Sequence, residues 1–290
     1  MLCAVNDLPI RPMTADDVPE AAALMDAGGW HGRRPFWEWV HSVPTIRAFV
    51  GEVDGRIAAT GIGTRNGDVG WVGSIFVNAG LRRRGFGRAI TEAVCLDLEA
   101  AGCTTLALIA SDLGRPVYET MGFRIDAWYQ IWEAETTAER EDPPAGRTIR
   151  RATAADLDGI AALDRRVTGN DRSGILAGLI DRTWILEGPE QGAPAGFLAQ
   201  ERADGGSVIA PDPDDGRLLL RHLRATGNGR VDRVRAALVR QPSGDVRPEA
   251  RDLLAHEGWT PAFETPRMLR GPSIPWEPDA IWGILSFAFG

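Results

Sequence analysis

Hydrophobic residues in the first half of the chain switch between a helical and a strand period, and each change of period marks an element. Residues 10–24 open as a short strand and continue, after a Thr or Asp capping residue, as an amphipathic helix. Residues 30–41 form a loop and a short second helix. The pattern then predicts strands at residues 45–53, 56–65 and 69–77, because Asp54-Gly55 and Asn66-Gly67-Asp68 suit tight turns between them.

The same half continues with a long helix, a buried strand, a short helix and a final strand. The long helix opens within residues 78–88 and runs until Gly102 stops it. The buried strand covers residues 104–110. A short helix with Pro116 near its first turn and a strand at residues 123–132 follow.

Two segments of the second half repeat segments of the first. Residues 10–24 and residues 149–163 share Ile, Arg, Thr-Ala, Asp and Ala-Ala-Leu at aligned positions. Residues 117–123 resemble residues 253–259, since each segment ends a helix at a glycine suited to left-handed geometry and continues with an aromatic residue. Two matches at nearly the same separation indicate the duplication of one domain.

A charged segment that ends in Pro and Gly separates the two copies. Residues 133–146 have no hydrophobic period and have the composition of a linker. With 290 residues, the chain is long enough for two domains that each bury a core. We therefore place the boundary near Pro143, with one domain at residues 1–142 and the other at residues 143–290.

Composition narrows the class of protein. Hydrophobic residues make up 44% of the sequence and charged residues 25%, and no apolar run approaches the roughly 20 residues of a membrane helix. The N-terminus lacks the features of a signal peptide, so we expect a cytoplasmic protein. The net charge of -8 argues against nucleic acid as the main partner. Cys3, Cys95 and Cys103 offer neither a disulfide framework nor metal-ligand spacing, so we expect reduced and mostly buried thiols.

Residues 77–88, Val-Asn-Ala-Gly-Leu-Arg-Arg-Arg-Gly-Phe-Gly-Arg, carry the clearest functional pattern. Small residues and cations meet where a strand leads into a helix, whose first-turn N–H groups and dipole favour an anion. Gly85 and Gly87 would let a phosphate approach the backbone, and the three arginines at 82–84 would add charge-assisted hydrogen bonds. The alternative is a solvated patch at an ordinary turn. The sequence has no nucleotide-binding phosphate loop, dinucleotide fingerprint or Gly-x-Ser-x-Gly elbow.

Together with the order of the elements, two motifs resemble those of the GNAT superfamily of acyl-CoA-dependent N-acyltransferases. The main motif, Arg/Gln-x-x-Gly-x-Gly/Ala at a helix start, is matched by Arg82, Gly85 and Gly87. The later motif, Tyr-x-x-x-Gly-Phe, is matched by Tyr118, Gly122 and Phe123. The resemblance covers residues 8–134, and the duplication extends it. It implies an α/β (α+β) fold of two tandem GNAT-like domains, each with a mixed, mostly antiparallel sheet flanked by helices.

The resemblance implies that the first domain binds acetyl-CoA and needs no metal. Main-chain groups at the end of a strand would pair with the pantetheine arm, and these belong to Ile75, Phe76 and Val77. The loop and helix start that would hold the pyrophosphate comprise Arg82, Arg83, Arg84, Gly85, Phe86, Gly87 and Arg88. The thioester would lie between the strands that end at Val77 and Ala110. Ser111 stands where many family members carry Asn, which puts one cofactor contact in doubt.

The resemblance also implies direct attack of a neutral amine on the thioester, with a proton passed to the departing thiolate. Tyr118 matches the usual general acid, and a phenol of pKa about 10 can protonate or hydrogen-bond a thiolate whose thiol has a pKa of about 8.5. The alternative for Tyr118 is a ring packed in the core; the other tyrosine, Tyr129, lies in no motif. Residues 71–77 lack the glutamate that often serves as the base. Deprotonation would run through water or through Glu38, His31 or His41.

The acceptor site in this fold is commonly shaped by the first two helices and their loop. That region holds Trp30, His31, Phe36, Trp37, Glu38 and Trp39. An aromatic wall with one carboxylate would suit a protonated amine through cation-π and ionic contact. We expect Trp37 and Trp39 to belong to the core, and Trp30, His31 and Glu38 to contact the substrate.

The second copy has lost the anion motif. Residues 208–220 lack the Gly-x-Gly pair and carry three aspartates, Asp212, Asp214 and Asp215, whose charges would oppose a pyrophosphate. Leu254 stands at the position of Tyr118. We therefore predict no CoA in this domain, as in the tandem-GNAT proteins that the chain resembles. Residues 170–173 either help to close the acceptor site or form a surface turn, and residues 281–289 are apolar enough for a packed strand.

These patterns predict an enzyme that transfers an acetyl group from acetyl-CoA to a primary amine of a small molecule. One alternative is an acyl-CoA-binding regulator without catalysis, which the missing base favours. Another is a protein acyltransferase whose second domain docks a polypeptide. We expect no nucleic-acid or membrane partner. We also expect a monomer, because the second domain could cover the surface through which single-domain relatives dimerise.

Overall fold

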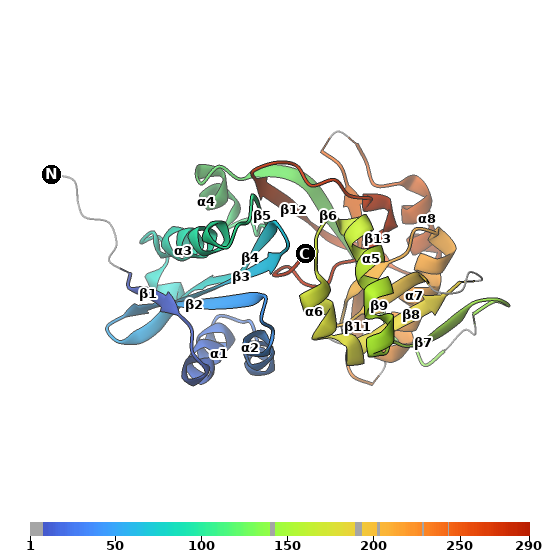
Figure 1. Cartoon of the computed structure of the whole chain (residues 1–290), viewed down its shortest axis with the longest axis horizontal. Coiled ribbons are helices and arrows are strands. Elements are labelled where there is room, and N and C mark those ends of the chain that lie inside the picture. The colour runs from blue at the N-terminus through green and yellow to red at the C-terminus, as the bar shows by residue number, and fades with distance from the viewer. Residues whose placement is uncertain (1–7, 140–142, 189–192, 202–203, 228, 243) are drawn as a thin grey trace. The chain divides into compact units, whose positions relative to one another are not determined.

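The structure is a computed structural model, and it describes residues 8–139, 143–188, 193–201, 204–227, 229–242 and 244–290 (Figure 1). The chain divides into two compact units. The first comprises the chain up to Arg124 together with Leu269–Pro272 and Phe289, and the second comprises Ile125–Met268, Ser273–Ala288 and Gly290. The boundary predicted near Pro143 adjoins residues 140–142, which lie outside the described residues.

The sheet of the first unit is mixed. Its strands follow in the order β1 (Ile10–Pro12), β2 (Ile46–Val53), β3 (Arg56–Asn66), β4 (Val69–Val77) and β5 (Thr105–Ile109). The pairs from β1 to β4 are antiparallel, whereas β5 runs parallel to β4. Asp54 and Gly55 have φ angles of 51° and 71°, which the tight turn between β2 and β3 requires. The strands predicted from the hydrophobic pattern are thereby confirmed.

Helices flank this sheet. They are α1 (Val18–Ala27), α2 (Arg33–Ser42), α3 (Phe86–Ala100) and α4 (Arg115–Thr120). Ile90, Val94 and Leu98 recur every four residues on α3 and are buried. Glycines on β3 let this face come close, since a Cβ on Gly63 would lie 3.1 Å from the side chains of Val94 and Leu98. The pattern of small residues on β3 therefore sets the spacing between helix and sheet.

Residues from late in the chain complete the first unit. Arg270, the last residue of β12 (Thr260–Arg270), forms an ion pair of 2.6 Å with Glu99 of α3. The Thr105 hydroxyl donates a hydrogen bond of 2.9 Å to the Pro272 carbonyl. Phe289 stacks on Phe36 of α2, with ring centroids 5.9 Å apart. These contacts explain why short distant segments group with residues up to Arg124.

The second unit has the same class of architecture. One group of strands follows the order β13 (Ile281–Gly283), β10 (Ser207–Ile209), β9 (Pro194–Ala199), β8 (Thr183–Glu187) and β7 (Thr148–Arg151), with antiparallel neighbours. Another group places β6 (Arg124–Glu135) between β12 and β11 (Arg233–Arg240). The helices are α5 (Leu157–Thr168), α6 (Ser173–Ala177), α7 (Pro213–Gly227) and α8 (Pro248–His256).

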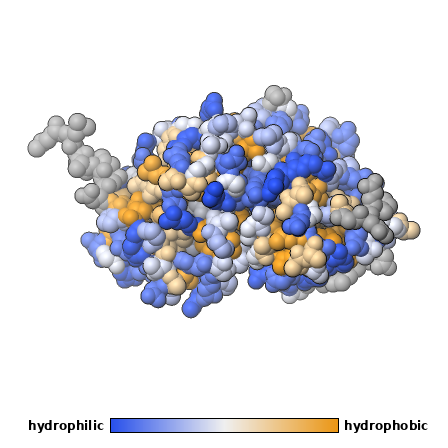
Figure 2. All heavy atoms as spheres, in the orientation of Figure 1, coloured by the Kyte–Doolittle hydropathy of each residue, from blue (hydrophilic) through white to orange (hydrophobic). Residues whose placement is uncertain are grey.

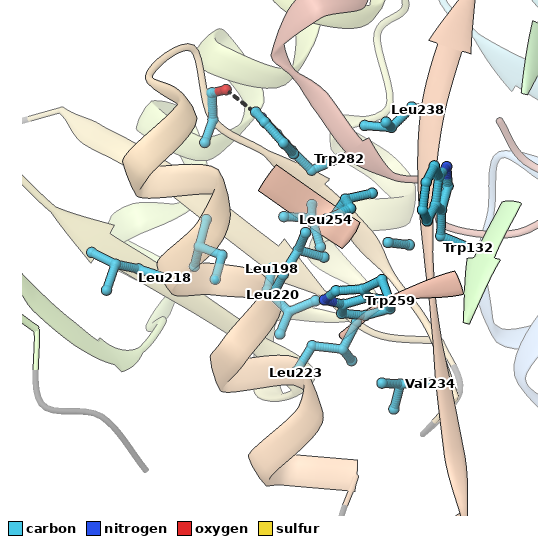
Figure 3. Close-up of a cluster of buried hydrophobic side chains, with 14 of the residues drawn as sticks. Trp132, Leu198, Leu218, Leu220, Leu223, Val234, Leu238, Leu254, Trp259 and Trp282 are labelled. Carbon is cyan, nitrogen blue, oxygen red and sulfur yellow. Dashed lines mark hydrogen bonds between the residues drawn. The ribbon is translucent and has the colours of Figure 1, made fainter. Parts of the chain in front are cut away.

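The core of the second unit gathers around α7 (Figure 3). Leu219, Leu220 and Leu223 of this helix lie in one buried cluster with four tryptophans, each from a different strand or loop. Each fully buried leucine contributes about 1.5–3 kcal/mol through the hydrophobic effect. The indole N–H of Trp282 donates to the Ala210 carbonyl at 3.0 Å, so this large ring is buried without an unpaired donor.

One ion-pair network occurs twice and confirms the duplication. In the first unit, Arg11 binds Asp17 at 2.7 Å and Glu52 at 2.6 Å. In the second, Arg150 binds Asp156 at 2.8 Å and Glu187 at 2.7 Å. Thr14 and Thr153 complete capping boxes with the respective aspartates. The arginine of the repeated Ile-Arg pair thus joins the first strand to a helix start and a second strand in each copy.

Two sequence predictions differ from the structure. The strand expected at residues 123–132 extends to Glu135, which takes the first residues of the expected linker. The apolar tail at residues 281–289 contains a strand only at Ile281–Gly283, because Phe289 packs on α2 instead. Hydrophilic residues cover much of the face seen in Figure 2, with hydrophobic patches between them. No helix in the described part of the chain has the length and apolar character needed to cross a membrane.

Candidate functional site

The parallel strands β4 and β5 pair over only part of their length. Their register joins Val69, Gly70 and Trp71 to Thr105, Leu106 and Ala107. From Val72 onward β4 continues to Val77 without β5 as its partner in this register. Backbone N–H and C=O groups on one side of the strand end are therefore open to an extended ligand. Ile75, Phe76 and Val77, predicted from the sequence to pair with such a ligand, lie in this part of β4.

A bulge bends β4 just before these residues. Ser74 has a φ of 48°, in the left-handed region that a residue with a side chain rarely adopts. The register between β3 and β4 shifts between Thr60 and Ile62 at the same place. The buried Thr60 hydroxyl donates to the Ser74 carbonyl at 3.1 Å and holds the bulge. Gly73-Ser74 inside a strand pattern was the sequence signal for this bend, because glycine in a strand often marks a bulge.

The loop after β4 presents the start of α3. Asn78 caps the 3-10 turn Ala79–Leu81 by accepting a 3.0 Å hydrogen bond from the Gly80 N–H. Arg83 and Gly85 then take left-handed φ angles of 63° and 84°, and α3 begins at Phe86. The first-turn N–H groups have no acceptor within the helix, so they are available to an anion. We call residues 82–88 the cofactor loop.

The arginines of the cofactor loop are exposed. Arg82 donates to the Val77 carbonyl at 3.3 Å, and its guanidinium lies 6.0 Å from the centroid of the Phe76 ring. Arg88 donates to the Thr120 hydroxyl of α4 at 3.1 Å. Arg83 and Arg84 are likewise exposed. The helix start therefore carries four cations, those at 82–84 and 88, that a phosphate group could attract.

The two other residues of this motif have different roles. Phe86 is buried and anchors the start of α3 in the core. Gly87 has open space beside it, since a Cβ there would meet only Val77, at 3.8 Å. The protein's own packing does not demand a glycine at this position. The missing side chain leaves room that a pyrophosphate would fill, so the residues present fit CoA.

Tyr118 lies in α4 with its ring against Gly114. A Cβ on Gly114 would lie 2.7 Å from the ring, and Phe123 packs on it with centroids 6.1 Å apart. Ser111 accepts a hydrogen bond of 3.2 Å from the Gly114 N–H and so begins the short helix. Burial, with a smaller effect from Cys95, raises the pKa of Tyr118 to about 12. The phenol is therefore a buried proton donor across the physiological range.

Tyr129 does not join this group. Tyr129 is in β6 of the second unit, opposite Val239, and burial raises its pKa. Cys95 and Cys103 are buried free thiols, whereas Cys3 lies outside the described residues. Within the described ranges no group of three His, Cys, Asp or Glu side chains could hold a metal ion.

Trp30 lies in the loop between α1 and α2, beside the end of β4. Its ring is 40% exposed and meets the Phe76 ring edge-on at 5.6 Å. Gly28 lets Phe76 approach this loop, because a Cβ there would lie 2.1 Å from the ring. The Arg33 guanidinium lies 5.1 Å from the centroids of both Trp30 and Phe36. Arg33 thus already supplies a cation to the ring predicted to receive a substrate amine.

The remaining predicted substrate residues lie on the surface or in the core. Glu38 is exposed and pairs with Arg34 one turn earlier on α2, at 3.0 Å. His31 and His41 are exposed. Trp37 is fully buried, as expected for a core residue, and the half-buried Trp39 packs edge-on to Phe289 at 5.3 Å. Among the described residues, the ion partner of Glu38 is Arg34, and no hydrogen bond joins Glu38 to Trp30.

Asp26, near the end of α1, is a residue that sequence reasoning missed. Its side chain is half-buried, and its Oδ1 atom is buried without a hydrogen-bond donor in the described part of the chain. The helical spacing in the sequence indicates that Asp26 belongs to the buried face, because it stands one turn after Ala22 in the apolar stripe of the helix. A carboxylate in such a stripe is a candidate for a function.

In the second unit, a side chain of the protein binds the first-turn N–H groups of the equivalent helix, α7. The Asp212 carboxylate accepts hydrogen bonds from the N–H groups of Asp214 at 2.8 Å and Asp215 at 3.4 Å. Asp215 is buried and pairs with Arg147 at 2.8 Å. Leu254, which replaces the tyrosine, is a fully buried core residue. The first-turn amides that an anion would need are therefore already occupied in this copy.

The interpretation of residues 170–173 as a surface turn is wrong. Arg172 is buried and donates to Asp164 through Nε at 3.0 Å and to the Ser207 hydroxyl at 2.8 Å. It also donates to the Gly290 carbonyl. A charge this deep in a protein requires such partners, and the sequence Asn-Asp-Arg-Ser gave no sign of the distant aspartate.

Comparison with known proteins gives a family match within the first unit and solved structures with a similar fold. Residues 16–123 match the model of the acetyltransferase (GNAT) family. A putative acetyltransferase from Pyrococcus horikoshii is 20% identical with a TM-score of 0.80, covering 98% of this chain and 96% of that one. A GCN5-related N-acetyltransferase from Sphaerobacter thermophilus is 16% identical with a TM-score of 0.64, covering 94% and 99%.

A further solved structure shares the tandem arrangement. It is a tandem GNAT protein from the clavulanic acid biosynthesis pathway, 17% identical with a TM-score of 0.60, and the match covers 92% of this chain and 100% of that one. The sequence matches none of the curated proteins. At these identities the structural matches establish the fold.

Proposed function

Because residues 16–123 form a domain of the acetyltransferase (GNAT) family and the whole chain has a GNAT-like fold, we propose that this protein is an N-acetyltransferase. In the proposed reaction, an acetyl group passes from acetyl-CoA to the primary amine of a small molecule. The first unit carries the reaction, and the second binds no CoA. The supporting observation for this asymmetry is the Asp212 carboxylate on the first turn of α7.

The geometry of the cofactor loop carries the proposal. The left-handed residues Arg83 and Gly85 present the first-turn amides of α3 beside the end of β4. The bulge at Ser74 and the divergence of β5 leave the β4 backbone open there. A phosphate-binding helix start next to an unpaired strand end suits a ligand with a pyrophosphate and an amide-containing arm, as CoA has.

Each part of this site has a proposed task. Acetyl-CoA supplies the thioester, whose carbonyl carbon a neutral amine attacks with release of the thiol. The cofactor loop binds the pyrophosphate, and Ile75, Phe76 and Val77 orient the pantetheine arm. Tyr118 holds a proton on its hydroxyl, which it donates to the leaving sulfur, and the proton that the attacking nitrogen loses passes through water and restores the phenol. Its raised pKa, about 12, keeps the proton in place until a thiolate forms nearby.

The first experiment is calorimetric titration with acetyl-CoA. Wild type is expected to bind one equivalent per chain. Gly85→Asp places a carboxylate and a strained side chain in the loop and should abolish binding, and Arg83→Ala should weaken it. Gly67→Asp is the matched control, because Gly67 has a similar φ of 72° in the exposed turn after β3. Equal binding by Gly85→Asp and wild type, or two equivalents per chain, would contradict the proposed site.

A second experiment separates catalysis from binding alone. Release of free thiol from acetyl-CoA is followed with a panel of primary amines. Turnover lost in Tyr118→Phe, with acetyl-CoA binding retained, supports the enzyme. Binding without turnover of any amine would instead favour an acyl-CoA-binding regulator.

A further inference from the structure

Asp26 combines burial with the lack of a partner. It lies in the last turn of α1, one turn after the buried Ala22, and its Oδ1 atom is buried. Among the residues that the structure describes, none donates a hydrogen bond to this oxygen. A buried anionic oxygen without a donor is unfavourable, so such a group is usually satisfied by water or by a ligand.

The position of Asp26 at the end of α1 also favours a bound cation. The carbonyls of the last turn carry the negative end of the helix dipole, which destabilises a carboxylate placed among them. The Met25 carbonyl accepts hydrogen bonds from the N–H groups of Gly28 and Trp30, at 3.0 Å and 2.9 Å, so the chain folds back at the end of α1. The cation that follows next, Arg33, has its guanidinium over the rings of Trp30 and Phe36.

The same few residues border the proposed thioester site. Gly28, two residues after Asp26, lies against the ring of Phe76, and Trp30 contacts that ring edge-on. Phe76 belongs to the strand end proposed to pair with pantetheine. The segment that follows Asp26 at the end of α1 therefore contacts the strand end proposed to hold the cofactor.

We propose that Asp26 binds the ammonium group of the acceptor, which is an amine protonated at neutral pH, and that the bound ammonium gives a proton to water before the neutral amine attacks the thioester. This inference rests on the proposed function, since it names the substrate class of that site. Asp26 takes the place of Glu38 as the carboxylate proposed to bind the substrate, since the carboxylate of Glu38 is paired with Arg34 at the surface. Aliphatic primary amines carry the required charge, whereas aromatic amines of the aniline type are neutral and gain nothing from the carboxylate.

The probes are benzylamine and aniline, which share a ring and differ in charge at neutral pH. Calorimetric titration of each into protein saturated with CoA measures acceptor binding without any reaction. Wild type is expected to bind benzylamine more tightly than aniline. Asp26→Asn should weaken benzylamine at least tenfold, which corresponds to about 1.4 kcal/mol, and leave aniline unchanged. Asp26→Glu should restore part of the affinity, because it keeps the charge.

Asp16→Asn is the matched control, because Asp16 is an exposed carboxylate of the same unit. It should bind benzylamine as wild type does. An Asp26→Asn protein with wild-type affinity for benzylamine, or a wild type that binds benzylamine no better than aniline, would overturn the assignment. A loss shared equally by both probes would also overturn it, since this indicates a structural role.

Failure of the Asp26 assignment can be distinguished from failure of the proposed function. Acetyl-CoA binding by Asp26→Asn is expected to equal that of wild type, because the cofactor loop is unchanged. If wild type and this variant both fail to bind acetyl-CoA, the proposed function fails. If both bind it and only benzylamine binding differs between them, both proposals stand.

Discussion

The ring of Trp30 meets the ring of Phe76 edge-on, with centroids 5.6 Å apart and an interplanar angle of 64°. Trp30 belongs to the loop after α1, and Phe76 belongs to the end of β4. Edge-to-face aromatic pairs add about 0.5–1.5 kcal/mol beyond the area that they bury. This pair therefore fixes the loop proposed to receive the amine against the strand proposed to hold the cofactor.

Replacing Trp30 tests this connection. Trp30→Ala should raise the KM for the amine about tenfold, because the loop loses its contact with β4 and its apolar wall. The affinity for acetyl-CoA should change little, because the backbone of β4 remains. Trp30→Phe keeps an aromatic edge and should retain most of the activity. Steady-state kinetics with calorimetry of acetyl-CoA checks both; an equal loss in Trp30→Ala and Trp30→Phe would speak against the contact.

Tyr118→Phe tests the proposed general acid. The variant should fold as stably as wild type, because it keeps the buried ring and its packing against Phe123. Its kcat should fall about 10²–10⁴-fold, the usual contribution of a general acid. Unfolding in urea provides the control for stability. A kcat within about twofold of wild type would leave Tyr118 as a core residue only.

The pH dependence gives a second view of the same residue. Burial raises the pKa of Tyr118 to about 12, so the folded protein holds this proton more tightly than the unfolded chain, where the pKa is about 10. Its contribution to stability is complete below about pH 10 and is lost as the pH rises toward the folded value. The rate should rise with pH as the amine deprotonates, without a fall due to Tyr118 below pH 10. A fall near pH 8 that Tyr118→Phe removes would disprove this assignment.

Arg172 offers a test of the second unit. Both side chains of the Arg172–Asp164 pair are buried, so Arg172→Ala should cost about 3–5 kcal/mol by leaving Asp164 charged and alone. Arg172→Met combined with Asp164→Leu should cost less than Arg172→Ala, since it removes both charges. The exposed pair of Arg165 and Asp171 is the control, and Arg165→Ala should change the stability little, because solvent screens this pair. Urea unfolding measures each; equal costs for Arg172→Ala and Arg165→Ala would be inconsistent with a buried pair.

The repeated arginines predict a matched response to acid. A hydrogen bond from Arg11 holds the pKa of Asp17 well below its usual range, against a smaller effect of burial, and Arg150 does the same to Asp156. Lowered folded pKa values contribute stability above the unfolded value of about 3.9, and that contribution is lost as the pH falls. Arg11→Ala and Arg150→Ala should each destabilise at pH 7, and the difference from wild type should shrink below about pH 4. Urea unfolding at several pH values checks this prediction. A loss of stability, relative to wild type, that grows as the pH falls would contradict it.

The sequence predicted the elements of the first unit well because each depends on local features. Hairpin turns, the glycine after a helix and the period of the buried face of α3 all act within a few residues. The match of residues 10–24 to residues 149–163 also led to the second domain, and the twin networks of Arg11 and Arg150 account for the shared Ile-Arg and Asp.

The rest depended on partners far along the chain. Arg172 contacts Ser207 and Gly290, and Phe289 contacts Phe36, and no local period predicts these contacts. Glu38 looked available from sequence because its partner Arg34 could equally have faced elsewhere. Asp26 was overlooked because an isolated acidic residue in a helix is usually solvated, and only its burial distinguishes it.

Neither compact unit is a single stretch of sequence. The first includes Leu269–Pro272 and Phe289, where Arg270 holds Glu99 and Phe289 stacks on Phe36. Splitting the gene after Arg124 would leave the first fragment without these anchors, and its helices α2 and α3 would each lose a partner. A break in the gene between the two repeated segments would therefore not give two intact units, because the first compact unit takes residues from the far end of the chain.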